Sequence, residues 1–190
     1  MLENLKRRSS THLRIIASIV LGLVTYSGSV GAESCDALLS PNSVRDLETQ
    51  AASLRSQVIR ATIPVVRAQR QALATEDSPG QVRALDEQLG LAELASSIAD
   101  VKAKLATAAY LAEAQQSMRG EADRAVLRRM TRKLAPSAVD AAVNAVSAAE
   151  EVSSATQRPG IKALASDMHA FLVRARDAFQ ACVDPASIAL

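Results

Sequence analysis

Apolar residues recur every three or four positions along most of this 190-residue chain, which is the spacing of one face of an α-helix. The clearest run begins at Ile161 and ends at Cys182, where the steps alternate between four and three residues. Leu164, Phe171 and Ala178 lie beside this seam and widen it. A face of that width predicts a helix packed in a multi-helix core rather than in a two-stranded zipper.

Three earlier segments show the same period, and turn-forming residues separate them. The predicted helices cover approximately residues 43–75, 79–118, 121–157 and 160–182. The sequence leaves open whether the second and third helices join through Gly120, because one glycine costs a helix only about 1 kcal/mol. The pattern predicts an all-α fold of about four long helices with the heptad spacing of coiled-coil packing.

Some local features of these helices are also predicted. Asn42 or Ser43 is expected to cap the first helix and Ser78 the second, and Pro136 should kink the third. A second apolar stripe should widen the buried face of the first helix: Ile59, Val66 and Leu73. The second helix begins with three apolar residues: Val82, Leu85 and Leu89. They are out of register with its later seam, which predicts a stutter near Gly90.

Short turns between helices of comparable length make consecutive helices antiparallel. An up-down-up-down order brings the start of the first helix and the end of the last helix to the same end of the bundle. The two cysteines of the chain, Cys35 and Cys182, lie at these two positions. We therefore expect a disulfide that ties the termini of the bundle together at one end.

Residues 1–32 have the pattern of a cleaved secretory signal peptide. Basic residues come first, an apolar run follows over residues 15–24, and small residues lead up to Ala32. Cleavage between Ala32 and Glu33 leaves residues 33–190 as a single helical-bundle domain. The alternative is a retained membrane anchor, although a spanning helix needs roughly twenty apolar residues. The predicted location is periplasmic or secreted.

The leader also accounts for the net positive charge of the chain. The chain has 22 Lys and Arg against 20 Asp and Glu, and without residues 1–32 these numbers become 18 and 19. Aromatic residues, on which single-stranded nucleic-acid binders stack bases, make up only 2%. No nucleic-acid partner is expected. The sign of the charge alternates from one predicted helix to the next, which favours pairing between neighbours.

The polar residues offer little for catalysis or metal binding. His169 is the one histidine after the leader, so the converging ligands that copper or zinc needs are lacking. Glu150 and Glu151 are adjacent and do not face each other on a helix. The chain has neither a phosphate-binding glycine loop nor the Gly-x-Ser-x-Gly elbow that carries a nucleophilic serine. We expect no enzyme activity, no cofactor and no metal.

One basic amphipathic stretch is the candidate binding surface. Its basic residues fall on one broad side of a helix: Arg124, Arg128, Arg129, Arg132 and Lys133. Its apolar residues fall on the other side: Val126, Leu127, Met130 and Leu134. Such a helix can bind an anionic lipid surface or an acidic partner. The alternative is an ordinary surface helix that faces the acidic second helix.

These features predict an exported, non-enzymatic helical bundle that acts as an interaction, adaptor or structural module of a bacterial-type envelope. The expected partner is a protein or an anionic envelope surface, and helix packing also allows a homo-oligomer. The alternative is a carrier that holds a small apolar ligand or cofactor in the bundle interior. Alanine-rich seams favour the first hypothesis, because small side chains let the helices close together.

Overall fold

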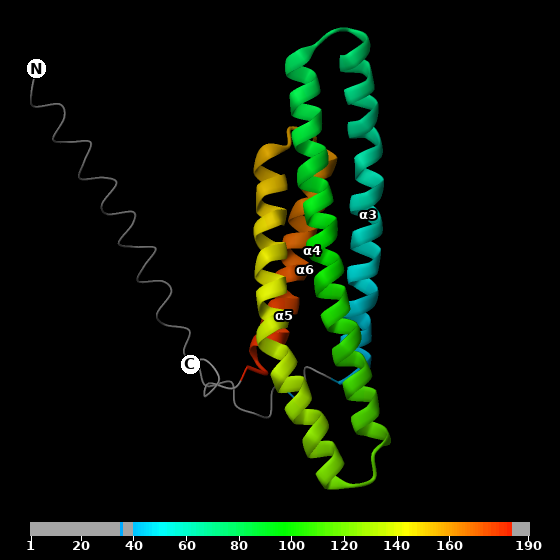
Figure 1. The fold of residues 1–190 in the computed structure, drawn as a ribbon, viewed down its shortest axis with the longest axis vertical. Coiled ribbons are helices and arrows are strands. Elements are labelled where there is room, and N and C mark those ends of the chain that lie inside the picture. Colours follow the sequence, from blue (N-terminus) through cyan, green and yellow to red (C-terminus); the bar gives the residue numbers. More distant parts are fainter. Residues whose placement is uncertain (1–34, 36–39, 184–190) are drawn as a thin grey trace, which may run out of the picture. The chain divides into compact units, whose positions relative to one another are not determined.

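The computed structural model describes Cys35 and residues 40–183, which form four α-helices (Figure 1). The helices are α3 (Pro41–Ala74), α4 (Ser78–Ser117), α5 (Glu121–Ala155) and α6 (Pro159–Gln180). The all-α prediction is confirmed, since the described part of the chain contains no strand. The predicted leader, with its cleavage site between Ala32 and Glu33, lies outside the described residues and stays a prediction.

Each helix packs against the next one along the chain, whereas α3 and α6 meet less closely. Gly120 lies in the turn between α4 and α5, so these are two separate helices. Cys35 and Cys182 form a disulfide, with their Cα atoms 4.8 Å apart, that links the start of α3 to the end of α6. The predicted antiparallel four-helix bundle and its disulfide are therefore confirmed.

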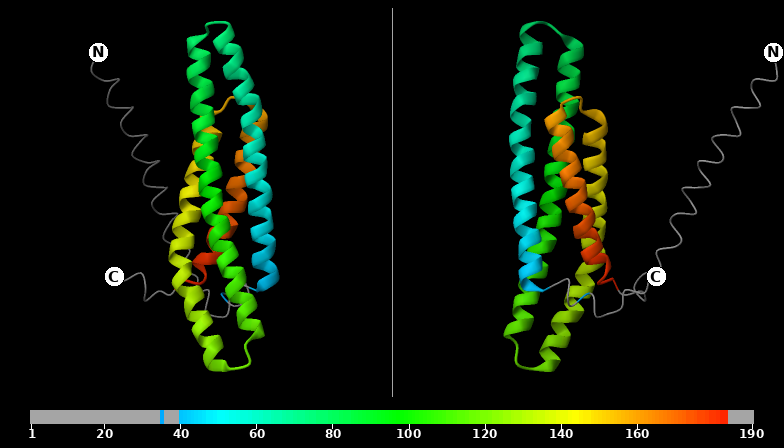
Figure 2. Two further views of the ribbon diagram at one scale, coloured as in Figure 1. Left: turned by 45° about the vertical axis from the view of Figure 1, so that its right-hand side comes forward. Right: turned by 180° about the vertical axis from the view of Figure 1, so that it is seen from behind.

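The turns of the bundle lie at different heights. Figures 1 and 2 show the α3–α4 turn extending beyond the α5–α6 turn, and the α4–α5 turn extending beyond the end of α6. Each projecting part is a pair of helices, so a helix there has one neighbour. A smaller share of its surface can then be buried than in the middle of the bundle.

The core combines small side chains on α5 with large ones on α6. The buried seam of α5 is mostly alanine: Ala135, Ala138, Ala142, Ala145, Ala148 and Ala149, with Val152. The predicted seam from Ile161 to Cys182 is buried throughout, and it includes Met168 and Phe179. Alanines allow the backbones to approach, and the large residues of the neighbouring helix fill the space between them.

The predicted helix caps were wrong by one to three residues. The α3 cap is Ser40, not Asn42 or Ser43, and its Oγ accepts a hydrogen bond from the amide of Ser43 (3.4 Å). The α4 cap is Asp77, and Ser78 is the first residue of that helix. Each cap precedes a proline in the first turn, where no amide donor is needed. α5 is one helix through Pro136, and the kink there stays a prediction.

The stutter predicted near Gly90 was wrong. α4 is one continuous helix, and its buried seam continues back from Leu91 to Ala84 without a change of register. Gly90 marks a close approach between helices, because a Cβ added there would lie 3.3 Å from Val152 Cγ2 on α5. The residues that suggested the stutter are exposed instead: Val82, Leu85 and Leu89.

The second apolar stripe of α3 is also not part of the core. Ile59 and Leu73 are exposed and Val66 is only half-buried, so the prediction that they widen the buried face was wrong. The buried residues of α3 form a single narrow seam: Val44, Ala51, Val58, Val65 and Ala72. The seam is narrow because α3 packs closely against α4 alone.

Candidate functional site

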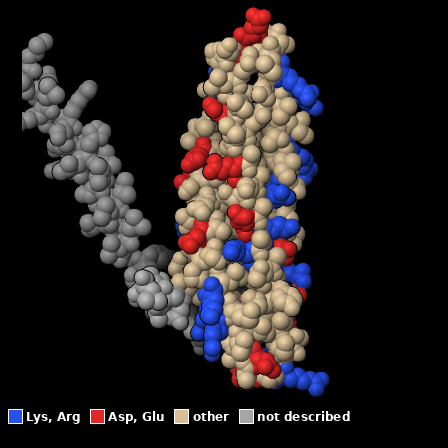
Figure 3. Space-filling model, in the orientation of Figure 1, with Lys and Arg blue, Asp and Glu red and all other residues tan. Residues whose placement is uncertain are grey.

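The predicted basic patch lies on the first half of α5. Three of its arginines, Arg124, Arg128 and Arg132, recur every four residues and line one surface pocket of about 320 Å³. Figure 3 shows basic side chains gathered over this part of α5. Arg129 and Lys133 are exposed but do not line this pocket. The structure thus brings three of the five predicted residues together.

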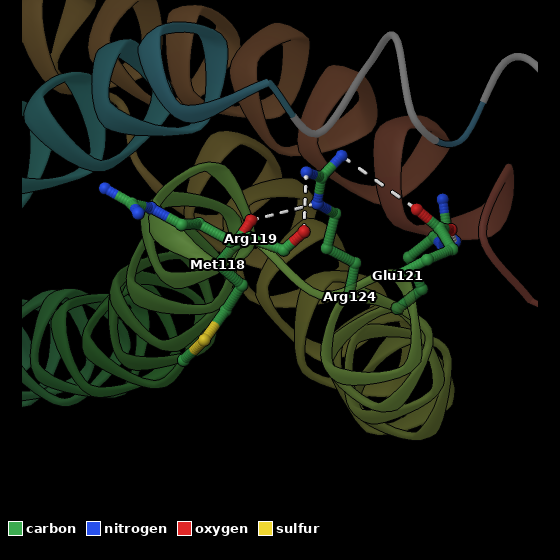
Figure 4. A network of polar contacts seen from close by, with 5 residues as sticks. Met118, Arg119, Glu121 and Arg124 are labelled. Atoms are coloured by element: carbon green, nitrogen blue, oxygen red, sulfur yellow. Dashed lines mark hydrogen bonds and ion pairs between the residues drawn. The ribbon is translucent and has the colours of Figure 1, made fainter.

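Two of these arginines are engaged at the α4–α5 turn (Figure 4). Arg124 Nε donates to the carbonyl oxygen of Met118 (3.0 Å), and Arg124 Nη2 donates to that of Arg119 (3.5 Å). Met118 is the C-cap residue of α4 and Arg119 follows it, so their carbonyl oxygens lie at the end of the helical hydrogen-bond pattern. Glu121 forms ion pairs with both Arg124 and Arg128. The local role of these two arginines is therefore to hold the turn.

Ion pairs between successive helices occur at other positions. Arg45 on α3 pairs with Glu113 on α4, and Arg158 in the α5–α6 turn pairs with Glu87 on α4 (2.8 Å). The hydrogen bond from Arg45 lowers the pKa of Glu113 below its ordinary value. The pair therefore stabilises the fold at neutral pH. Its contribution to stability is lost as the pH falls through the lowered pKa of Glu113. In the patch, by contrast, Arg124 and Arg128 form ion pairs with Glu121 of α5 rather than with the acidic α4.

Replacing Arg124 and Arg128 with alanine should lower the free energy of unfolding by about 1–2 kcal/mol. Exposed ion pairs contribute up to about 1 kcal/mol each, and a hydrogen bond contributes about 1 kcal/mol. Urea unfolding followed by circular dichroism measures the loss. The matched control is Arg129→Ala with Lys133→Ala, which removes the same charge and should change stability by less than about 0.5 kcal/mol. Equal losses in the two variants would contradict the turn-holding role.

A second surface was not predicted from the sequence. It lies on the outer side of the α3–α4 pair, which the left view of Figure 2 brings forward, and we call it the hairpin face. Its residues are Ile59 (48% exposed), Ile63 (49%), Val66 and Leu73 (57%) on α3, and Val82 (58%), Leu85 (46%) and Leu89 (61%) on α4. Single exposed apolar residues are common, but a cluster of this kind marks a contact surface.

The two halves of the hairpin face lie side by side. Gln88 Nε2 donates to Gln69 Oε1 (2.7 Å), and Gln81 Nε2 donates to the carbonyl oxygen of Ala72 (3.4 Å). These contacts define the antiparallel register of α3 on α4. In this register the following residues lie level with each other: Leu73 and Val82, Arg70 and Leu85, Val66 and Leu89. The apolar side chains therefore form one surface that crosses both helices.

Charges of opposite sign flank the hairpin face. The exposed charges at its two edges are basic on α3 and acidic on α4: Arg60, Arg67 and Arg70, and Asp86 and Glu93. In Figure 3, basic side chains follow the α3 edge of the bundle and acidic side chains lie over α4. The hairpin face is thus an apolar strip with one basic edge and one acidic edge.

His169 has a structural contact. Its Nε2 lies 3.1 Å from Oε1 of Glu150, so this pair joins α6 to α5. Within the described residues, no group of three or more histidine, cysteine, aspartate or glutamate side chains is placed to hold a metal ion. The side chains of His169 and Glu150 are both largely exposed, so their contact joins α5 and α6 at the surface of the bundle.

The fold places this protein in the class of antiparallel four-helix bundles, which serve many unrelated functions. Comparison with protein-family models, with curated proteins and with solved structures finds no match to this chain. None of the described helices is long and apolar enough to cross a membrane. The function is therefore argued from the basic patch and the hairpin face.

Proposed function

We propose that this protein is an exported, non-enzymatic interaction module that binds a protein partner through the hairpin face. The observation that carries the proposal is the cluster of large apolar side chains exposed along α3 and α4. Fully burying one such side chain is favourable by about 1.5–3 kcal/mol relative to leaving it exposed. These side chains remain exposed in the folded chain, so their burial by a partner contributes to the free energy of binding.

A carrier for a small apolar ligand has less support. Such sites are concave and mostly apolar, with only a few polar groups. The pocket of about 320 Å³ is lined by three arginines. Another pocket, of about 480 Å³, lies between the α3–α4 hairpin and the α5–α6 turn and includes Asp77, Arg83 and Glu87.

A third pocket, of about 240 Å³, lies between α4 and α5 and has a more apolar lining, which includes Leu91 and Val152. It also carries the carboxylates of Asp86, Glu93 and Glu151. Each of these pockets therefore presents several charged groups, which an apolar ligand site keeps to a few.

An anionic envelope surface is also less well supported as the partner. Glu121 offsets part of the positive charge at Arg124 and Arg128, which leaves Arg129, Arg132 and Lys133 as the exposed basic residues. Exposed charges attract an anionic surface only within the screening length, about 8–10 Å at physiological ionic strength. A protein partner at the hairpin face uses both apolar burial and charge.

Export rests on two features. Structural disulfides persist outside the reducing cytoplasm. The Cys35–Cys182 bridge, which joins the two ends of the bundle, is a structural disulfide. Residues 1–32 have the signal-peptide pattern, which supports delivery to the periplasm or the medium. Intact-mass measurement of the native protein tests this proposal, since a chain cut before Glu33 lacks the leader.

Binding through the hairpin face is tested with the variant Leu85→Glu with Leu89→Glu. We expect chemical cross-linking in the native envelope, followed by affinity capture, to recover a partner with the wild type and not with this variant. Its thermal unfolding should be unchanged, because both residues are exposed. The control is Val126→Glu with Met130→Glu, which changes two exposed apolar residues of α5 and should keep the partner. The same cross-linked products from all three proteins would contradict the proposal.

A further inference from the structure

We infer that the partner at the hairpin face is a second copy of this chain, related to the first by a two-fold axis parallel to α3 and α4. This inference rests on the proposed function, because it names the protein that the hairpin face binds. Three observations carry it: the apolar surface, the opposite charges at its two edges, and the register of α3 on α4.

A two-fold axis along the helices brings the hairpin face of one copy against the same face of the other. α3 of each copy then lies opposite α4 of the other copy, and every residue keeps its height along the axis. Leu73 and Val82 are level within one copy, so Leu73 faces Val82 of the second copy. Val66 and Leu89 meet in the same way. In the same register Leu85 faces Arg70 of the second copy, so the apolar contacts lie on either side of this position.

The same symmetry brings the charged edges together in complementary pairs. The register of α3 on α4 places Asp86 level with Arg67 and Arg70, and Glu93 level with Arg60, to within about one helical turn. In the dimer, the acidic edge of each copy lies against the basic edge of the other. This contact between an acidic edge and a basic edge occurs twice, once at either side of the interface. Such complementarity favours one arrangement over its alternatives.

The other face-to-face arrangement brings like charges together. An axis perpendicular to the helices places α3 opposite α3 of the second copy. Between Ala51 and Thr75, α3 has arginines and no acidic residue: Arg55, Arg60, Arg67 and Arg70. Facing arginines repel, and like-charge contacts across an interface are costly. Charge therefore selects the axis that is parallel to the helices.

The hairpin face is large enough for the centre of a dimer interface. Six of its apolar side chains are 46–61% exposed, which corresponds to roughly 500 Å² of apolar surface in each copy. A standard stable interface buries about 800 Å² on each partner. The charged residues at the two edges contribute the remaining surface, as polar residues do at the rim of protein interfaces.

A lipid surface fits the hairpin face less well than a second copy does. The α3–α4 turn at one end of this face carries Glu76 and Asp77, and Figure 3 shows acidic side chains at that end. Asp86 and Glu93 line one edge. Anionic headgroups repel these carboxylates. A second copy instead presents arginines to the acidic edge.

The test is the mass in solution of protein purified from cells that express the full chain. Light scattering after size exclusion should give twice the mass of one chain for the wild type at micromolar concentration. Val82→Glu with Leu89→Glu places carboxylates opposite Leu73 and Val66 of the second copy, so this variant should give a single chain with an unchanged melting temperature. Val126→Glu with Met130→Glu should remain dimeric. A monomeric wild type at these concentrations, or a dimer that the Val82 and Leu89 variant keeps, would overturn the inference.

A charge swap tests the direction of the axis. Asp86→Arg should weaken the dimer about three- to tenfold in Kd, because it places three basic side chains together. Adding Arg67→Asp and Arg70→Asp to Asp86→Arg should restore the wild-type Kd, since opposite charges face each other again. Analytical ultracentrifugation gives these constants. A triple variant that is weaker than Asp86→Arg alone would rule out the parallel axis.

Two results separate this inference from the proposed function. A monomeric wild type that captures a different envelope protein, and loses it with Leu85→Glu and Leu89→Glu, overturns the second-copy inference alone. A monomeric wild type that captures no protein through the hairpin face overturns both.

Discussion

Replacing Cys35 and Cys182 with serine should lower the free energy of unfolding by about 2–4 kcal/mol. The bridge joins residues that are 147 apart in sequence, so it restricts nearly the whole described chain in the unfolded state. The chain-entropy model gives about 4–5 kcal/mol for a loop of this length, and measured values are commonly smaller. In a domain of this size, the loss corresponds to a decrease of roughly 5–15 °C in melting temperature.

Calorimetry or thermal circular dichroism of the double variant checks this expectation. The matched control is the wild type in excess reducing agent, which should melt at the temperature of the double variant. Helix content near 20 °C should change little, because the seams of α3 and α6 do not depend on the bridge for their burial. An unchanged melting temperature after removal of both cysteines would show that the helices alone restrict the ends of the bundle.

The seams of the central bundle could be predicted because their period depends only on the geometry of one helix. α6 shows this most clearly: from Ile161 to Cys182, each residue of the predicted seam is buried. The disulfide followed from the number and direction of the helices, since four antiparallel helices bring Cys35 and Cys182 to one end. Local periodicity and chain direction are both properties that the sequence displays directly.

The hairpin face could not be predicted because its exposure depends on where the neighbouring helices lie. Val82, Leu85 and Leu89 have a helical period of their own, and a register shift that buries them is the ordinary expectation. In the structure, α4 keeps one register, and these residues lie outside its buried seam. The sequence did contain a signal for the hairpin face, because α4 has two apolar stripes in different registers. Two apolar stripes on one helix predict two contact surfaces.

The contacts of the basic patch could not be predicted from the sequence for a different reason. Three of the predicted basic residues, Arg124, Arg128 and Arg132, line one pocket, whereas Arg129 and Lys133 do not. The sequence did not indicate the partners of these arginines. Glu121 and the carbonyl oxygen of Met118 engage Arg124 at the turn, where the backbone direction changes. Contacts of this kind depend on the conformation of the turn, which charge patterning along a helix does not specify.

Phe171→Ala should lower the free energy of unfolding by about 3–5 kcal/mol, the range for removing a fully buried aromatic ring. Phe171 is 1% exposed and lies with Leu54 of α3 at the place where α3 and α6 meet. Because α3 and α6 meet less closely than the successive helix pairs, few other side chains there can move in to fill the space. The removed ring therefore leaves most of its volume empty.

Denaturant unfolding measures this loss, and an exposed aromatic provides the control. Tyr110 on α4 is 71% exposed, so Tyr110→Ala should change the free energy of unfolding by less than about 0.5 kcal/mol. Phe171→Leu should lose only part of the Phe171→Ala effect, since leucine refills much of the space. If Phe171→Ala were as stable as Tyr110→Ala, the contact between α3 and α6 would add nothing to the core. The bundle would then be held only by its three successive helix pairs and the disulfide.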